Sequence, residues 1–166
     1  MMRWRRLLIP GIAISLAAVL NSYFLLNAYV PSESMSPTIP AGAMVLGDRL
    51  AYRKEEPQVG DIIFFRHLTA GKQRWMVKRV IAVPGQIFVL RAGRVYLDGK
   101  LLEEEYIHAF SYDDYPEVLV PEGCYIVLGD NRLESNDSRF WNEMFVQRDD
   151  ILAKGLYVYF PKLYRL

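Results

Sequence analysis

The chain has few of the residues that usually build disulfides and metal centres. Its 166 residues include one cysteine, Cys124, and two histidines, His67 and His108. One cysteine cannot form an internal disulfide, and no cysteine and histidine cluster has the spacing of a zinc site. His67 follows an apolar run and His108 lies in an acidic segment, so neither has a polar motif beside it. We therefore expect no metal and no histidine-based catalytic pair.

An excess of charge of either sign is also missing. The formal net charge is +1 at pH 7, and the basic residues are scattered apart from Arg3, Arg5 and Arg6 at the N-terminus. Such a chain has no general electrostatic attraction for nucleic acid. The sequence therefore predicts no nucleic-acid partner.

Charged residues are missing altogether from residues 7–30. Roughly 20 apolar residues suffice to cross the hydrocarbon core of a bilayer as a helix, so we expect a single transmembrane anchor over residues 7–30. By the positive-inside rule, the arginines would keep residues 1–6 in the cytoplasm and place residues 31–166 on the far side. The alternative is a cleaved secretory signal, whose apolar core would have about 7 to 15 residues and end in small ones. This run is longer and ends in Ala-Tyr-Val-Pro, which favours the anchor.

After Val30 no long helical period appears, and short β-rich runs are separated by turn residues. These runs cover residues 43–50, 61–65, 75–83, 87–90, 94–97, 124–128 and 155–160. Asp98-Gly99 predicts a two-residue hairpin turn between two strands. We expect one mainly β domain of antiparallel, coiled or partly barrel-like sheets. Residues 103–117, acidic and rich in tyrosine, are expected to form an exposed excursion between strands.

Lys78 lies in the expected strand over residues 75–83. Strand alternation puts Met76, Lys78, Val80 and Ala82 on one face, so the lysine has apolar neighbours. Burial of an amine lowers its pKa, which makes the neutral form available as a general base near neutral pH. A lysine that snorkels from an edge strand is the alternative, and only the company of other motifs favours the catalytic interpretation.

Two polar segments are the other motifs that favour a catalytic Lys78. Ser32-Glu-Ser34-Met-Ser36-Pro37 directly follows the apolar run, and any of its hydroxyls is a candidate nucleophile. A serine nucleophile needs a base and donors for the oxyanion, and Ser32 and Ser34 at a spacing of two can supply attack and donation. In the turn 129–139, Asp137 and Arg139 can pair and brace Ser135 so that it orients the lysine.

These residues resemble four sequence boxes of the bacterial type I signal peptidases, in the family's order and after one apolar segment. The boxes are Ser32-x-Ser34-Met-x-Pro37-Thr38, Gly60-Asp-Ile-Ile63, Lys78-Arg-Val-Ile-Ala-Val-Pro-Gly85 and Gly129-Asp-Asn-Arg132 with Ser135-x-Asp-Ser-Arg139. The resemblance covers nearly the whole chain. Glu134 departs from it, because many members have asparagine there, and the short segment between the last two boxes implies a small or absent cap domain.

The resemblance implies a serine peptidase that removes signal peptides from exported proteins. Ser34 would be the nucleophile and Lys78 the general base, with Ser32 and the Ser34 amide as oxyanion donors. Ser135 would orient the lysine, supported by the Asp137–Arg139 ion pair. No cofactor is implied. The expected partners are preprotein signal peptides, membrane lipid and the protein-export machinery, and the expected location is the bacterial cytoplasmic membrane.

Because three residues separate Val30 from Ser34, an extended link of about 13 Å predicts a nucleophile close to the membrane surface. Cleavage sites of signal peptides follow small residues, and shallow apolar pockets would recognise them. Neighbours in sequence supply candidates for these pockets: Val30, Met35, Ile39, Met76 and Val77.

Two other functions remain open from the sequence, and a third is excluded. A peptidase of conjugative-transfer systems that processes one pilin-like protein would share the chemistry. A self-cleaving repressor would need a DNA-binding domain, and none fits before Pro31. A membrane-tethered β module could bind peptides without catalysis.

Overall fold

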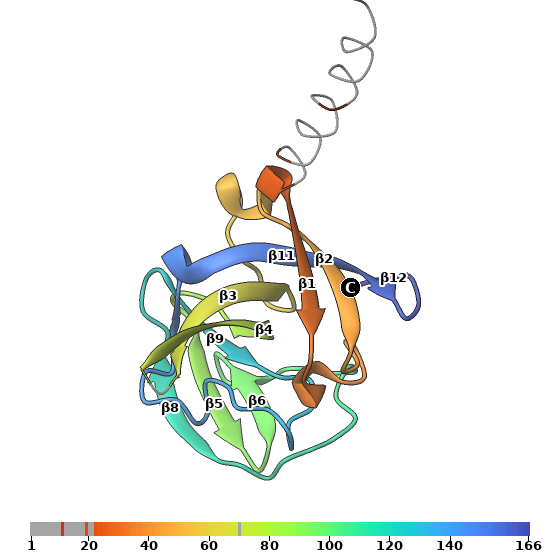
Figure 1. Cartoon of the computed structure of the whole chain (residues 1–166). Coiled ribbons are helices and arrows are strands. Elements are labelled where there is room, and N and C mark those ends of the chain that lie inside the picture. Colours follow the sequence, from red (N-terminus) through yellow and green to blue (C-terminus); the bar gives the residue numbers. More distant parts are fainter. Residues whose placement is uncertain (1–10, 12–18, 20–21, 70) are drawn as a thin grey trace, which may run out of the picture.

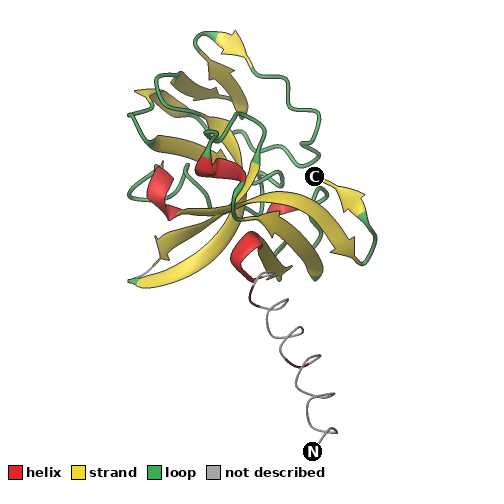
Figure 2. Cartoon of the chain, turned by 90° about the horizontal axis from the view of Figure 1, so that it is seen from above, coloured by secondary structure: helices red, strands yellow, loops and turns green. Residues whose placement is uncertain are grey.

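A computed structural model describes residues 11, 19, 22–69 and 71–166 of the chain. It is built almost entirely of strands, with short helical turns between them (Figure 2). The strands are β1 (Leu25–Val30), β2 (Ala43–Asp48), β3 (Ile62–Thr69), β4 (Lys72–Ala82), β5 (Ile87–Arg91), β6 (Arg94–Leu97), β7 (Lys100–Leu101), β8 (Tyr115–Leu119), β9 (Cys124–Leu128), β10 (Val146–Gln147), β11 (Ile151–Phe160) and β12 (Tyr164–Arg165). The 3-10 turns are η1 (Glu33–Met35), η2 (Ala51–Arg53) and η3 (Arg148–Asp150).

The strands form two sheets. The larger has the order β1-β2-β11-β3-β4-β9-β10, with β12 attached to β11, and the smaller has the order β7-β6-β5-β8. Every pair of named strands in both sheets is antiparallel. The smaller sheet lies at the end of the domain opposite residues 22–24 (Figure 1). The prediction of a mainly β domain with antiparallel sheets is therefore confirmed.

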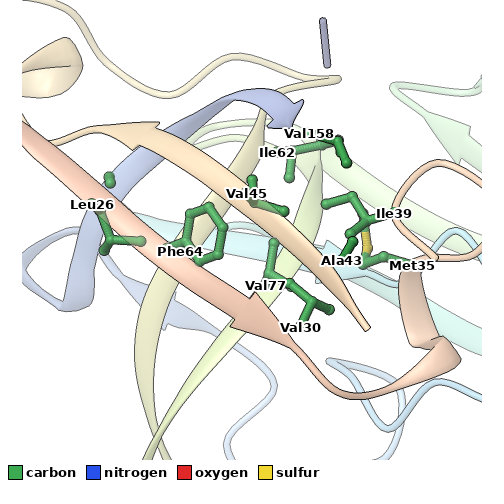
Figure 3. Packing of buried hydrophobic residues seen from close by; sticks show 11 residues of the cluster. Leu26, Val30, Met35, Ile39, Ala43, Val45, Ile62, Phe64, Val77 and Val158 are labelled. Atoms are coloured by element: carbon green, nitrogen blue, oxygen red, sulfur yellow. The ribbon is translucent and has the colours of Figure 1, made fainter. Parts of the chain in front are cut away.

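Both faces of the central strands are covered, which explains their nearly continuous apolar sequences. Ile62, Phe64 and Val77 pack with β1 and β2 in one cluster, whereas Ile63 and Phe65 pack on the opposite face. Figure 3 shows the first cluster enclosed beneath β1 and β2. A third cluster, which includes Phe88 and Ile126, joins the smaller sheet to the larger one. A strand buried on both faces cannot show the polar and apolar alternation of a half-exposed strand.

The hairpin at Asp98-Gly99 is confirmed. Leu97 pairs with Lys100 across the turn, so the loop has two residues. Asp98 and Gly99 have φ values of 51° and 77°, and a type I′ turn requires positive φ at both positions. Asp and Gly tolerate that conformation better than other residues, and the sequence signal is therefore local and physical.

The predicted transmembrane anchor extends too far along the chain. Residues 22–24 are helical, but Leu25–Val30 form strand β1 and pair with β2 from Leu25↔Asp48 to Val30↔Ala43. Leu26 and Val30 are buried in the domain core, so these six apolar residues belong to the folded domain and the prediction of a span through Val30 is wrong. Residues 1–10, 12–18 and 20–21, which carry the rest of the predicted anchor and the cytoplasmic N-terminus, lie outside the described residues.

Among the helices that the structure describes, none has the length and apolar character needed to cross a membrane.

The prediction of an exposed excursion over residues 103–117 is wrong in part. Tyr115–Leu119 form strand β8, which pairs with β5. Ile107 and Ser111 are buried, and Ala109 forms an isolated parallel bridge with Asn131. The segment thus packs against the domain, although its sequence is acidic.

The third cluster gives a test of how the two sheets are joined. Phe88 is 1% exposed, so Phe88→Ala should lower the free energy of unfolding by about 3 to 5 kcal/mol because it removes buried apolar area and leaves a cavity. Leu119→Ala, on the neighbouring strand β8 at 61% exposure, should change it by less than about 0.5 kcal/mol. Denaturant unfolding measures both, and equal effects would contradict this packing.

Candidate active site

Ser34 lies in the turn η1, directly after strand β1. Met35 and Ile39, both 0% exposed, anchor this loop in the core, and the Ile39 amide donates a hydrogen bond to the Met35 carbonyl at 2.8 Å. Ser34 itself is 5% exposed. A hydroxyl held this way by its neighbours has little freedom to change direction.

Lys78 reaches Ser34 from strand β4. Its Nζ donates a hydrogen bond to the Ser34 Oγ at 2.5 Å, across 44 residues of sequence. Met76 and Val80 pack in one cluster, as strand alternation predicts for the lysine's face. Ala82 was predicted on that face but packs in another cluster, because a register shift between Val80 and Ala82 breaks the alternation. The shift comes after Lys78 and leaves its placement unchanged.

The surroundings of Lys78 favour a neutral amine. Burial lowers the pKa of Lys78 from 10.5 to about 8, because the apolar interior disfavours the charged form. Asp137 and Asp130 act in the opposite direction, and Arg139 lowers the pKa further. A pKa of about 8 leaves a usable fraction of free amine near neutral pH, which a general base requires.

Ser32 lies beside Ser34. Its Oγ is 3.3 Å from the Ser34 Oγ, and the two hydroxyls form a hydrogen bond in which either can be the donor. The structure therefore brings Ser32, Ser34 and Lys78 together. The role of Ser32 as an oxyanion donor stays a prediction.

The ion pair between Asp137 and Arg139 is present and fully buried. Arg139 Nε donates to Asp137 Oδ1 at 2.8 Å and Nη2 donates to Oδ2 at 2.9 Å. Asp137 Oδ2 also accepts the Gly129 amide at 2.9 Å. Because Gly129 directly follows strand β9, this carboxylate fixes the start of the turn 129–139. We call residues 129–139 the last-box turn.

The predicted bond between Ser135 and the lysine is not formed. Ser135 is 5% exposed, and its Oγ has no hydrogen-bond partner among the described residues. It packs instead against Gly129, where a Cβ would lie 2.3 Å from the Ser135 Oγ and 2.3 Å from the Ser34 carbonyl oxygen. Ser135 and the Ser34 backbone therefore both lie against Gly129. The role of Ser135 as a residue that orients the lysine stays a prediction.

Sequence reasoning missed two further ion pairs at the site. Arg79 makes a bidentate pair with Asp130 at 2.8 and 2.6 Å, and Arg132 pairs with Glu104 at 2.5 Å. Arg79 follows the lysine directly and Asp130 and Arg132 belong to the last box, so three of these residues were inside motifs. Nothing in the spacing indicated the partners.

A groove of about 400 Å³ leads to Ser34. One wall is residues 27–31 of β1 and the following loop, and the other is residues 74–78 of β4. Of the predicted pocket residues, Val30, Met76 and Val77 line the groove. Met35 and Ile39 do not line it, because their side chains are fully buried in the first hydrophobic cluster. The prediction is wrong for these two residues. Val30 and Val77 lie close together in Figure 3.

No group of three or more histidine, cysteine, aspartate and glutamate side chains in the described part of the chain could hold a metal ion.

The antiparallel β fold and the contact between the Ser34 hydroxyl and the Lys78 amine are those expected of a serine hydrolase. The family model described as signal peptidase, peptidase S26, matches residues 1–160, and the chain belongs to this family of serine peptidases. It is 38% identical over 158 residues to a probable signal peptidase I-1 of Synechocystis, covering 90% of this chain and 79% of the relative.

Two further relatives agree. The signal peptidase I of Bacillus caldolyticus is 32% identical over 164 residues, covering 90% of this chain and 87% of the relative. The crystal structure of a signal peptidase I from Enterococcus faecalis superposes with a TM-score of 0.50 at 30% identity, covering 60% of this chain and 97% of that one. The resemblance found from the four boxes is therefore confirmed.

The lowered pKa of Lys78 predicts how Ser34 reactivity depends on pH. Only the neutral amine can accept the serine proton, so the rate of Ser34 acylation by a serine-directed probe should be low in acid, rise through a midpoint near pH 8 and then level off. Stopped-time labelling from pH 5 to about pH 11.5, beyond the ordinary pKa of lysine, measures this. A midpoint near 10.5, the ordinary value for lysine, would contradict a buried base.

Gly129 provides a test of the packing between the last-box turn and Ser34. A Cβ at this position would lie 2.3 Å from a main-chain oxygen of Ser34, which cannot rotate away. Gly129→Ala should therefore slow Ser34 acylation by about 100-fold, since a misplacement of about 1 Å has that effect. Asn136→Ala, exposed in the same turn, is the control and should label at the normal rate.

Proposed function

We propose that the chain is a membrane-anchored endopeptidase that removes N-terminal signal peptides from exported preproteins, using Ser34 and Lys78. The single observation that carries the mechanism is the 2.5 Å hydrogen bond between the Lys78 amine and the Ser34 hydroxyl in a buried site. Family membership supports the substrate class, since the relatives named above are signal peptidases.

The reaction is acyl transfer without a cofactor. Neutral Lys78 accepts the Ser34 proton as the Ser34 Oγ attacks the scissile carbonyl, and the resulting oxyanion accepts hydrogen bonds from the Ser32 hydroxyl and the Ser34 amide. Collapse breaks the C–N bond, and the leaving amine takes a proton from protonated Lys78. A water then attacks the ester and Lys78 again accepts a proton, which it returns to the Ser34 Oγ as the ester C–O bond breaks.

The geometry of the groove supports an extended substrate. β1 is the last strand of its sheet, and β4 pairs with β9 only from Arg79 onward. Both groove walls are therefore strand edges, and four successive antiparallel pairings make β1 and β4 run in the same direction. A substrate strand between them would complete the barrel-like curve of β1-β2-β11-β3-β4. The apolar side chains of Val30 and Val77 would then contact small substrate side chains before the scissile bond.

The anchor, the orientation and the partners belong to this proposal. Residues 7–24 would contain the membrane span, with residues 1–6 in the cytoplasm and the peptidase domain outside, in the cytoplasmic membrane of a bacterium. Strand β1 changes the expected distance to the membrane: its six residues extend about 20 Å away from the end of the helix. Strand β1 runs away from helical residues 22–24 (Figure 1), and Ser34 follows the end of β1 in the turn η1, so the expectation of a link of about 13 Å from the bilayer is abandoned. Preproteins, lipid and the export machinery are the proposed partners.

Cleavage of a preprotein in detergent by purified full-length variants tests the proposal. Ser34→Ala and Lys78→Met should each lower kcat by about four orders of magnitude or more, because either change removes the nucleophile or its only base. Lys78→Arg should be equally inactive, since a guanidinium stays protonated. Ser135→Ala should retain more activity than these. Cleavage close to the wild-type rate by Ser34→Ala or Lys78→Met would refute the dyad.

Two controls separate the competing functions. A panel of unrelated preproteins should all be cleaved, whereas a pilin-processing peptidase would cleave one. A peptide-binding module without catalysis would show no labelling of Ser34 by an acylating probe that depends on Lys78.

A further inference from the structure

Residues 103–113 form a strap that crosses the last-box turn, and the two segments are joined at three places. Glu104 pairs with Arg132, Ala109 forms a bridge with Asn131, and Arg139 donates hydrogen bonds to Ser111 Oγ at 2.9 Å and Asp113 Oδ2 at 2.8 Å. The strap is a connection between β7 and β8 of the smaller sheet. It therefore couples the smaller sheet to the turn beside the nucleophile.

The pair of Glu104 and Arg132 is the more buried of the two ion pairs among these links, since the Asp113 side chain that pairs with Arg139 is 37% exposed. The Glu104 side chain is 7% exposed and the Arg132 side chain 2%. Arg132 donates to both carboxylate oxygens, at 3.3 and 2.5 Å, and the Tyr106 hydroxyl donates to the same carboxylate at 2.7 Å. A charge buried this deeply is stable only with its partner, and removal of one partner leaves the other uncompensated.

Arg132 passes this constraint to the nucleophile. Its Nε donates to the Gly129 carbonyl at 3.1 Å, which ties the side chain to the start of the turn. The Asn131 amide donates to the Ser34 carbonyl at 3.1 Å, and Gly129 packs against that same oxygen. One chain of contacts thus leads from Glu104 through Arg132 and the turn backbone to Ser34.

The strap takes no part in the groove walls, which β1, its following loop and β4 supply. We propose that Glu104 is a positioning residue for the peptidase reaction: it holds Arg132 so that the last-box turn keeps the Ser34 backbone aligned with Lys78. This inference rests on the proposed function. Because the groove does not depend on the strap, loss of Glu104 should affect the rate of reaction rather than substrate binding.

The test compares Glu104→Ala with Glu105→Ala in the full-length protein in detergent. Glu105 is exposed, on the same segment and of the same charge, and serves as the matched control. Glu104→Ala should lower kcat for a preprotein by about 10- to 100-fold with KM changed by less than about twofold, and Ser34 acylation should slow by the same factor. Glu105→Ala should match the wild type in all three quantities. A wild-type kcat in Glu104→Ala would overturn the proposal.

A second variant separates positioning from general stability. The double variant Glu104→Leu with Arg132→Met replaces the buried pair by apolar side chains, which often leaves stability close to the wild type. The free energy of unfolding of the double variant should be close to that of the wild type. Its kcat and its rate of Ser34 acylation should stay low, because the hydrogen bond from Arg132 to the Gly129 carbonyl is still missing. Recovery of rate together with stability would show a merely structural role and overturn the proposal.

Two further measurements keep the test decisive. If Glu104→Ala does not fold, Glu104→Gln takes its place, because it keeps the size and one acceptor oxygen; its kcat should lie between those of the wild type and the double variant, and a wild-type value would overturn the proposal. If the wild type cleaves no preprotein, the proposed function fails, but the acylation rates still decide whether Glu104 positions Ser34.

Discussion

The proposed reaction depends on one amine that stays neutral next to one hydroxyl inside the protein. Burial lowers the pKa of Lys78 to about 8, but two carboxylates, Asp137 and Asp130, act to raise it. Each of these carboxylates is held by an arginine, Arg139 or Arg79, in a bidentate pair. Arg139 in turn lowers the pKa of Lys78, so it offsets a charge that would otherwise favour the protonated lysine. The buried ion pairs around the dyad thus bear on its reactivity as well as on the shape of the turn.

The parts of this structure that could be predicted were those with a local physical cause. The apolar strand neighbours of Lys78 follow from a period of two residues, and the hairpin at Asp98-Gly99 follows from the positive φ that its turn requires. The ion pair of Asp137 and Arg139 joins residues two positions apart. The family resemblance named Ser34, which spacing alone left among several hydroxyls.

The parts that could not be predicted depend on tertiary contacts. An uncharged apolar run has the same composition in a buried strand as in a helix, so the sequence did not separate Leu25–Val30 from the segment before it. The acidic strap looked exposed because its partners, Arg132 and Arg139, lie 28 and 26 residues away from Glu104 and Asp113. Met35 and Ile39 are adjacent to the nucleophile in sequence, but the turn η1 directs them into the core. Ser135 likewise packs against Gly129.

The length of strand β1 also sets a distance along the groove. The strand begins directly after the last helical residue and ends next to the loop that carries Ser34, and one wall of the groove lies along it. An extended chain advances about 3.3 Å per residue whichever strand it belongs to. A segment that enters at the helix end and runs beside β1 therefore needs about as many residues as β1 itself, six, to reach Ser34. A shorter spacer would stop before the hydroxyl, and a longer one would have to bulge out of the groove.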